Sequence, residues 1–219
     1  MPRVLSIETA THGRVVVETA ADPAARGLIV AFHGYGQRAE DMLDEVRRIP
    51  GIAAWHVAAV QALHRFYDRS NQKVIASWMT REDREAAIAD NIKYVDHAVD
   101  QVSLSSGGPS TGALCFLGFS QGVAMAFRAA LLGSHRAAGV IALGGDIPPE
   151  LRSCETSRWP PVLIGGGVYD SWYSPAKLDQ DVSFLEERKI PHRVVRFEGG
   201  HQWTDEFRAA VGAWLSSGL

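Results

Sequence analysis

The sequence contains very little cysteine. Only Cys115 and Cys154 occur in 219 residues, which is too few for the disulfide framework of a small secreted protein. Cys115 lies inside an apolar run, where a buried free thiol behaves as a small hydrophobic side chain. This cysteine usage predicts a reducing compartment, and we therefore expect a cytoplasmic protein.

An excess of positive charge and long apolar runs are also lacking. Lys and Arg number 22 against 25 Asp and Glu, a net charge of −3, so the chain offers no electrostatic footprint for DNA or RNA. Glu8 interrupts the N-terminal segment where a secretory signal needs apolar residues. Runs of 18 or more apolar residues do not occur, so we expect neither a signal peptide nor a membrane-spanning helix.

Motifs for nucleotides and metals are absent as well. The sequence has no glycine-rich phosphate loop with its lysine, no His-Glu-x-x-His and no Cys-x-x-Cys pair. These are the patterns that hold phosphate groups or zinc. We therefore expect a protein that uses neither a cofactor nor a metal.

The composition that remains is that of a globular domain, with 46% hydrophobic and 21% charged residues. Short runs rich in β-branched residues alternate with helical patterns, which is typical of an α/β fold with a mostly parallel central sheet covered by helices on both faces. No repeat or shift in composition divides the chain, so we expect one domain over residues 1–219. The expected strands are residues 4–7, 14–18, 28–32, 55–60, 113–117, 138–143, 161–165 and 193–197.

One serine stands at a turn between an expected strand and an expected helix. Gly118-Phe119-Ser120-Gln121-Gly122 is a G-x-S-x-G pattern that follows the strand at 113–117. In a nucleophile elbow such a turn projects the serine hydroxyl, and the flanking glycines keep strand and helix from crowding each other. The helix N-terminus favours negative charge developing nearby. We interpret Ser120 as a nucleophile, although any glycine-rich turn can produce this pattern by chance.

A serine nucleophile requires a base and a carboxylate that orients this base. His201 follows the last expected strand, and Asp170 follows the strand at 161–165. The chain order of serine, aspartate and histidine is the one expected in an α/β-hydrolase. Asp146, after the preceding strand, is the rival acid, and we favour Asp170 because acid and base then follow the last two strands. Each residue also has a purely structural interpretation, a capped turn or a solvated loop.

Two backbone N–H groups are candidates for an oxyanion hole. His33-Gly34-Tyr35-Gly36 ends the strand at 28–32, where such an enzyme needs a donor for the tetrahedral oxyanion. We assign the two donors to Tyr35 and to Gln121, the residue after the serine. We expect His33 to brace the loop rather than to transfer protons.

Aromatic side chains are frequent in the segments expected around this site. Residues 61–80 are polar, aromatic and without periodicity, which is typical of a functional loop, and we expect them to face the substrate. Some of the aromatics could be ordinary packing residues, because aromatic side chains dominate packing. The candidate substrate-binding residues are Tyr67, Trp78, Trp172 and Trp203.

Taken together, these motifs resemble the phospholipase/carboxylesterase family of α/β-hydrolases, which includes carboxylesterases and acyl-protein thioesterases. The resemblance spans nearly the whole chain, and Phe-Ser-Gln is its most specific element. It implies Ser120 as nucleophile, Asp170 as acid and His201 as base. The motifs that carry it are residues 33–36, residues 118–122, Ser77-Trp78, residues 167–170 and Gly200-His201.

The sequence departs from the family pattern at Gln37, Val123 and Tyr173. These departures leave the triad intact. They bear on whether this chain shares the acyl-protein or long-chain substrates of the family. The residues and the resemblance therefore predict a serine hydrolase that cleaves a small-molecule carboxylic ester through an acyl-enzyme. Two alternatives stay open: a thioesterase or lactonase of the same fold, and a non-catalytic ligand-binding protein. A homodimer also stays open, because Trp214 could belong to the core or to a dimer face.

Overall fold

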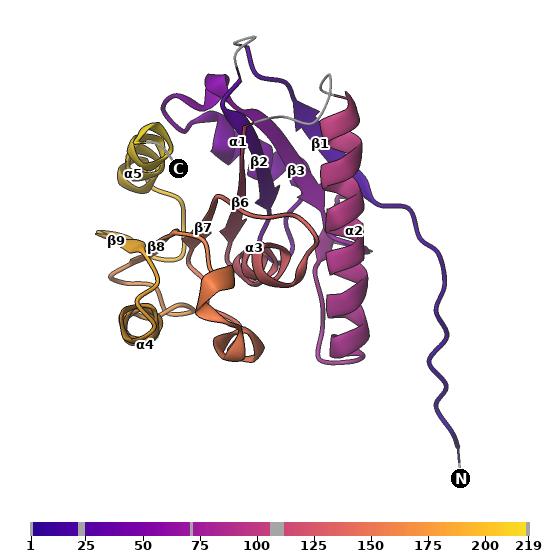
Figure 1. Cartoon of the computed structure of the whole chain (residues 1–219). Coiled ribbons are helices and arrows are strands. Elements are labelled where there is room, and N and C mark those ends of the chain that lie inside the picture. The colour runs from indigo at the N-terminus through magenta and orange to yellow at the C-terminus, as the bar shows by residue number, and fades with distance from the viewer. Residues whose placement is uncertain (1, 22–24, 71, 106–111, 218–219) are drawn as a thin grey trace.

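The computed structural model describes residues 2–21, 25–70, 72–105 and 112–217. Its centre is a seven-stranded sheet in the order β1-β3-β2-β6-β7-β8-β9 (Figure 1). β1 runs antiparallel to β3, and the other neighbouring strands are parallel. The strands of this sheet are β1 (Arg14–Glu18), β2 (Gly27–Phe32), β3 (His56–Gln61), β6 (Ala113–Phe119), β7 (Gly139–Leu143), β8 (Val162–Gly167) and β9 (His192–Phe197).

Helices cover both faces of the sheet (Figure 1). Apolar residues of α1 and α5 pack on one face, and those of α2, α3 and α4 pack on the other. The helices are α1 (Ala39–Arg47), α2 (Arg84–Ser105), α3 (Gln121–Leu132), α4 (Pro175–Glu187) and α5 (Asp205–Ser216). Short 3₁₀ helices cover Ile52–Ala54, Pro149–Ser153 and Thr156–Arg158.

The central strand β2 is buried on both faces, which explains why its sequence is apolar at every position. Val30 and Phe32 belong to the core under α2, α3 and α4, whereas Ile29 and Ala31 belong to the core under α1 and α5. Successive side chains of a strand point to opposite faces, so a strand buried on both faces has no polar side. The α/β fold with a mostly parallel sheet, predicted from such runs, is confirmed.

The prediction of a strand at residues 4–7 is wrong. The segment ahead of β1 has no regular secondary structure, and Val4, Leu5 and Ile7 are exposed. Figure 1 shows this segment running away from the body of the molecule. A strand requires a neighbour for its backbone hydrogen bonds, and none of the described strands pairs with these residues.

The loop expected at residues 61–80 is largely a β-hairpin. Its strands are β4 (His64–Tyr67) and β5 (Val74–Ser77), which pair antiparallel. A bridge between Ala76 and Gln37 ties this hairpin to the loop after β2. The aromatic residues that suggested a substrate loop are therefore in part strand residues, in keeping with their β-propensity.

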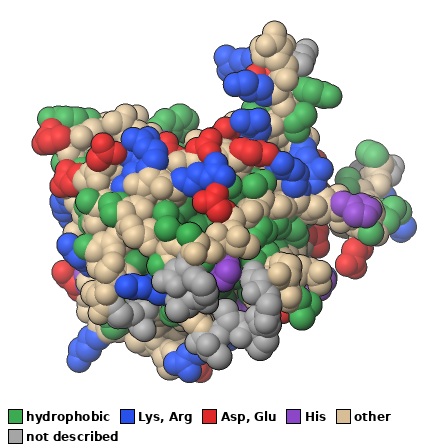
Figure 2. Space-filling view, turned by 90° about the horizontal axis from the view of Figure 1, so that it is seen from above, with side chains coloured by type: hydrophobic (Ala, Val, Ile, Leu, Met, Phe, Trp, Pro, Cys, Tyr) green, Lys and Arg blue, Asp and Glu red, His purple; other side chains and the backbone are tan. Residues whose placement is uncertain are grey.

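Trp214 on α5 belongs to the core. It is 9% exposed and packs in the same cluster as Phe207 and Val211. In the described ranges, none of the helices combines the length and the apolar composition that crossing a bilayer requires. Figure 2 shows acidic and basic side chains intermixed over one face of the molecule, in line with the small net charge of −3.

Candidate active site

Ser120 occupies a strained turn between β6 and α3. Its φ of +54° lies in the left-handed region, which non-glycine residues rarely adopt. The turn is tight on both sides of the serine, because a Cβ at Gly122 would lie 2.1 Å from the Phe32 carbonyl oxygen. A Cβ at Gly118 would lie 2.4 Å from the Gly122 carbonyl oxygen. The two glycines therefore permit the approach of helix and strand that holds Ser120 in this conformation.

Ser120, His201 and Asp170 form one hydrogen-bonded chain. The Ser120 hydroxyl lies 2.7 Å from His201 Nε2 and donates to it. His201 Nδ1–H donates to Asp170 Oδ2, also over 2.7 Å. Asp170 is buried, and its other oxygen accepts the backbone N–H groups of Trp172 at 2.8 Å and Tyr173 at 2.9 Å. These bonds fix the carboxylate, which in turn fixes the tautomer and orientation of the imidazole.

The rival acid, Asp146, pairs with a residue other than His201. Its side chain is exposed, and it pairs with the Lys177 ammonium at 3.4 Å.

Besides its bond to Asp170, the His201 ring lies close to two other residues. It lies 5.1 Å from the ring of Phe119, and a Cβ at Gly144 would lie 3.2 Å from its Cε1.

The loop after β2 contains a candidate donor, the backbone N–H of Tyr35. The N–H of Gly34 donates to Gln37 Oε1 at 2.7 Å, and the N–H of Gly36 donates to the Ala76 carbonyl at 2.9 Å. Within the part of the chain that the structure describes, the N–H of Tyr35 has no acceptor. A donor left unused between two occupied ones is available to a ligand, which is what an oxyanion hole requires.

His33 braces this loop from inside the protein. Its Nε2 accepts the N–H of Ala62 at 3.1 Å, and its Nδ1 donates to the Gly34 carbonyl at 2.7 Å. Burial lowers the pKa of His33, although the Gly34 contact acts in the opposite direction. The imidazole is thus neutral and fully used in structural hydrogen bonds, so it is not placed to transfer protons.

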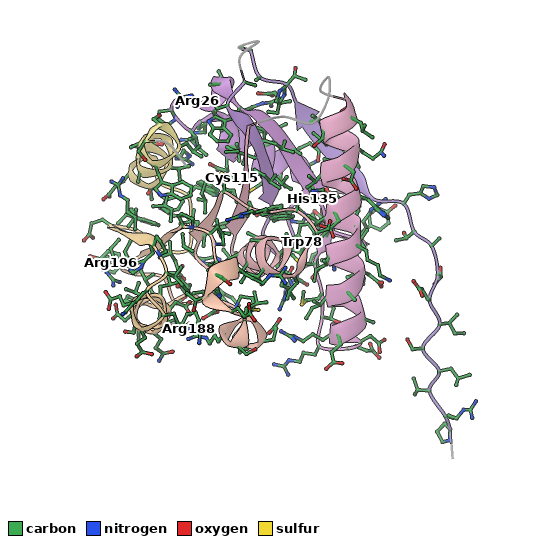
Figure 3. The ribbon with its side chains drawn as sticks, in the orientation of Figure 1. Arg26, Trp78, Cys115, His135, Arg188 and Arg196 are labelled. Atoms are coloured by element: carbon green, nitrogen blue, oxygen red, sulfur yellow. The ribbon has the colours of Figure 1, made fainter. Side chains whose placement is uncertain are left out.

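Trp78 does not lie on a substrate surface. Its side chain has no exposed area, and its Nε1–H donates to the His33 carbonyl at 2.8 Å. Figure 3 shows it inside the molecule, next to α3. A side chain without exposed area cannot contact a substrate, so the expectation for Trp78 is corrected: it supports the loop that carries Tyr35.

The side chain of Gln121 links the elbow to the segment after β5. Its Oε1 accepts the N–H of Trp78 at 2.9 Å, and its Nε2 donates to the Met79 carbonyl at 3.0 Å. With the Trp78 indole bonded to the loop after β2, this arrangement connects both expected oxyanion donors, Tyr35 and Gln121, through one buried residue.

The other aromatic candidates differ in position. Trp172 is 76% exposed and lines a cavity of about 330 Å³ at Ser120. Tyr67 is exposed at the end of β4 and is not part of this cavity wall. Trp203 is half-buried and packs against Phe119 and Phe207. Of the four candidates, Trp172 is therefore the one that lines the cavity at the serine.

Three basic residues in the same cavity wall were not expected from the sequence. Arg84 begins α2, Arg128 lies in α3 and Lys177 lies in α4. A usable signal exists for Arg128, because it is the single charged residue in the apolar helix Gln121–Leu132. A charged residue on a buried helix requires a partner or a function. Arg84 and Lys177 carry no comparable signal.

Comparison with known proteins gives the same fold. The carboxylesterase of Bacillus cereus has a TM-score of 0.75 at 15% identity, covering 94% of this chain and 95% of that one. Acyl-protein thioesterase 2 of Zea mays has 0.73 at 17%, covering 94% and 99%. Esterase PE8 has 0.73 at 22%, covering 95% and 100%. No match was found among curated proteins.

A family model described as Phospholipase/Carboxylesterase matches residues 12–164. This match includes Ser120 and the loop after β2, but it ends before Asp170 and His201, whose places rest on the geometry above. The resemblance predicted from the motifs is confirmed. Because the model matches well over half of the sequence, the chain belongs to the phospholipase/carboxylesterase family.

Proposed function

We propose that the protein is a serine hydrolase that cleaves carboxylic esters through an acyl-enzyme. The observation that carries this proposal is the hydrogen-bonded chain from Ser120 through His201 to Asp170, with 2.7 Å at each step. A serine hydroxyl is a poor nucleophile unless a base removes its proton. Here the base is in contact with the hydroxyl before any substrate arrives.

In acylation, Ser120 Oγ forms a bond to the ester carbonyl carbon while its proton passes to His201 Nε2. The resulting imidazolium is stabilised by the buried Asp170 carboxylate. As the tetrahedral intermediate collapses, the bond to the leaving alcohol breaks and His201 returns the proton to that oxygen. In deacylation a water molecule takes the place of the alcohol, and the acid is released with Ser120 restored.

Negative charge on the carbonyl oxygen requires donors that are already in place. We assign this role to the backbone N–H groups of Tyr35 and Gln121. The unused N–H of Tyr35 and the position of Gln121 at the start of α3 support this assignment. Trp172 is the proposed aromatic contact for the substrate, since it lines the cavity at Ser120. Tyr67 and Trp203 are outside that wall and are not assigned.

Thioesters are the second candidate substrates, because the same apparatus accepts any activated acyl group. The cavity of about 330 Å³ lies at the small end of ligand sites. It therefore favours a short acyl chain over a long one for either type of substrate.

The test is the turnover of p-nitrophenyl acetate by Ser120→Ala. Loss of the nucleophile should lower kcat by on the order of 10⁶ relative to the unchanged protein. Ser183→Ala, at an exposed position of α4, is the matched control and should retain full activity. Full activity of Ser120→Ala would overturn the proposed mechanism.

A further inference from the structure

The cavity at Ser120 has a positively charged wall. Arg84, Arg128 and Lys177 line it together with the acid Asp146. Glu150 is shared by two of these cations: it accepts from Arg128 at 2.6 Å and from Arg84 at 3.2 Å. Among the residues that line the cavity, these three cations outnumber the one carboxylate. Such a wall raises the local concentration of anions.

Arg128 is the fixed member of this group. Its side chain is 2% exposed, and both Nε and Nη2 donate to one oxygen of Glu150. Its Nη1 meets only the Met79 sulfur, at 3.5 Å, among the described residues. A guanidinium carries five N–H donors and stays charged in proteins. One carboxylate shared with a second arginine leaves part of this donor capacity unused.

Arg84 is the accessible member. Its side chain is 43% exposed. Among the described residues it bonds to Glu150 alone, and only its Nη2 donates. Its remaining donors are open to solvent and to anything bound in the cavity. Lys177, by contrast, is already bonded to Asp146 and to the Trp172 carbonyl.

One of the cations, Arg128, lies on the helix that begins directly after the nucleophile. Gln121, Ala124 and Arg128 all line the cavity and recur at helical spacing on one face of α3. A rise of about 1.5 Å per residue separates the Cα atoms of Gln121 and Arg128 by roughly 10 Å. The Cα–Cβ bonds of a helix tilt towards its N-terminus, which in α3 is the end next to Ser120.

We propose that this wall is a subsite for an acid group, and that the substrate is a small ester carrying a carboxylate a few bonds from the carbonyl that Ser120 attacks. Arg84 contacts the carboxylate directly, and Arg128 holds Arg84 in place through the shared Glu150. This inference rests on the proposed ester hydrolysis and narrows its substrate class. A long apolar acyl chain would instead place methylene groups against charged guanidinium and ammonium groups, which is unfavourable.

The test compares esters that differ only in charge. Monoethyl succinate is measured against its neutral amide, ethyl succinamate, by pH-stat titration at pH 7.5. 4-Acetoxybenzoate is measured against 4-acetoxybenzamide, which moves the carboxylate to the leaving group. In one of the two pairs the acid should be preferred in kcat/KM by about tenfold, the effect of one charge-assisted contact. The preference should shrink between 50 and 500 mM NaCl because salt screens accessible charges.

Arg84→Gln should remove most of this preference. Arg196→Gln is the matched control, since Arg196 is 42% exposed, also bonds to one carboxylate, and lies on β9 at the outer side of the molecule (Figure 3). It should keep the preference. The subsite is refuted if neither acid is preferred, or if Arg84→Gln keeps the full preference. Failure of the proposed function is a different result: no ester is hydrolysed at all.

Discussion

Replacing Trp78 tests whether this residue supports the loop that carries Tyr35. In Trp78→Phe the indole N–H is lost, so the buried His33 carbonyl loses the donor that lies 2.8 Å away. An unsatisfied buried acceptor costs about 1–3 kcal/mol, and the space left by the smaller ring adds roughly 1 kcal/mol. We therefore expect the free energy of unfolding to fall by about 2–4 kcal/mol.

Activity should fall in a characteristic way in the same variant. The His33 carbonyl lies two residues before Tyr35, so a shifted loop misplaces the proposed oxyanion donor. We expect kcat for p-nitrophenyl acetate to fall by roughly tenfold with little change in KM, less than the 10²–10³ that loss of a whole donor costs.

Urea unfolding and steady-state kinetics measure both effects. Trp172→Phe is the control for the stability measurement alone, because Trp172 is 76% exposed and its substitution should change the unfolding free energy by less than about 0.5 kcal/mol. If Trp78→Phe were as stable as the unchanged protein and showed a raised KM, Trp78 would be a substrate contact and not a support of the loop after β2.

Three further predictions concern the acid, the brace and the elbow. Asp170→Asn should lower kcat by about 10⁴, whereas Asp146→Asn should lower it far less, and the reverse order would identify Asp146 as the acid. Burial lowers the pKa of His33 from 6.5, so the unfolded chain binds this proton first and stability falls as the pH drops below about 6.5. His33→Gln should reduce that slope by up to ~1.4 kcal/mol per pH unit in urea titrations from pH 7 to 4, and an unchanged slope would mean that His33 has the same pKa in the folded and the unfolded chain. Gly122→Ala should lower Tm by several degrees and abolish activity, because its Cβ would meet the Phe32 carbonyl at 2.1 Å; unchanged Tm and activity would contradict the tight elbow.

The fold and the candidate triad could both be predicted from the sequence, and for the same reason. In a parallel sheet, residues that follow the strands all gather at one edge. Once the strands are recognised by their apolar runs, Ser120, Asp170 and His201 are expected to be neighbours although 81 residues separate the first from the last. Nothing about side-chain orientation is required for that step.

Features that depend on contacts between distant segments could not be predicted from the sequence in this way. The burial of Trp78 follows from the hairpin that Gln37 and Ala76 tie to the loop after β2, and no local pattern reports that contact. The apolar residues at positions 4–7 fit a strand, but whether a neighbouring edge is available to them is a tertiary question. Arg84 reaches the cavity only because α2 begins next to Glu150.

The central claim is that Ser120 is activated by His201 and Asp170. A fluorophosphonate probe reacts with an activated serine, and intact-protein mass spectrometry counts the adducts. We expect one adduct per chain, located on Ser120 by peptide mapping and formed far more slowly in Asp170→Asn. No adduct, or an adduct on another residue that forms at the same rate in Asp170→Asn, would contradict it.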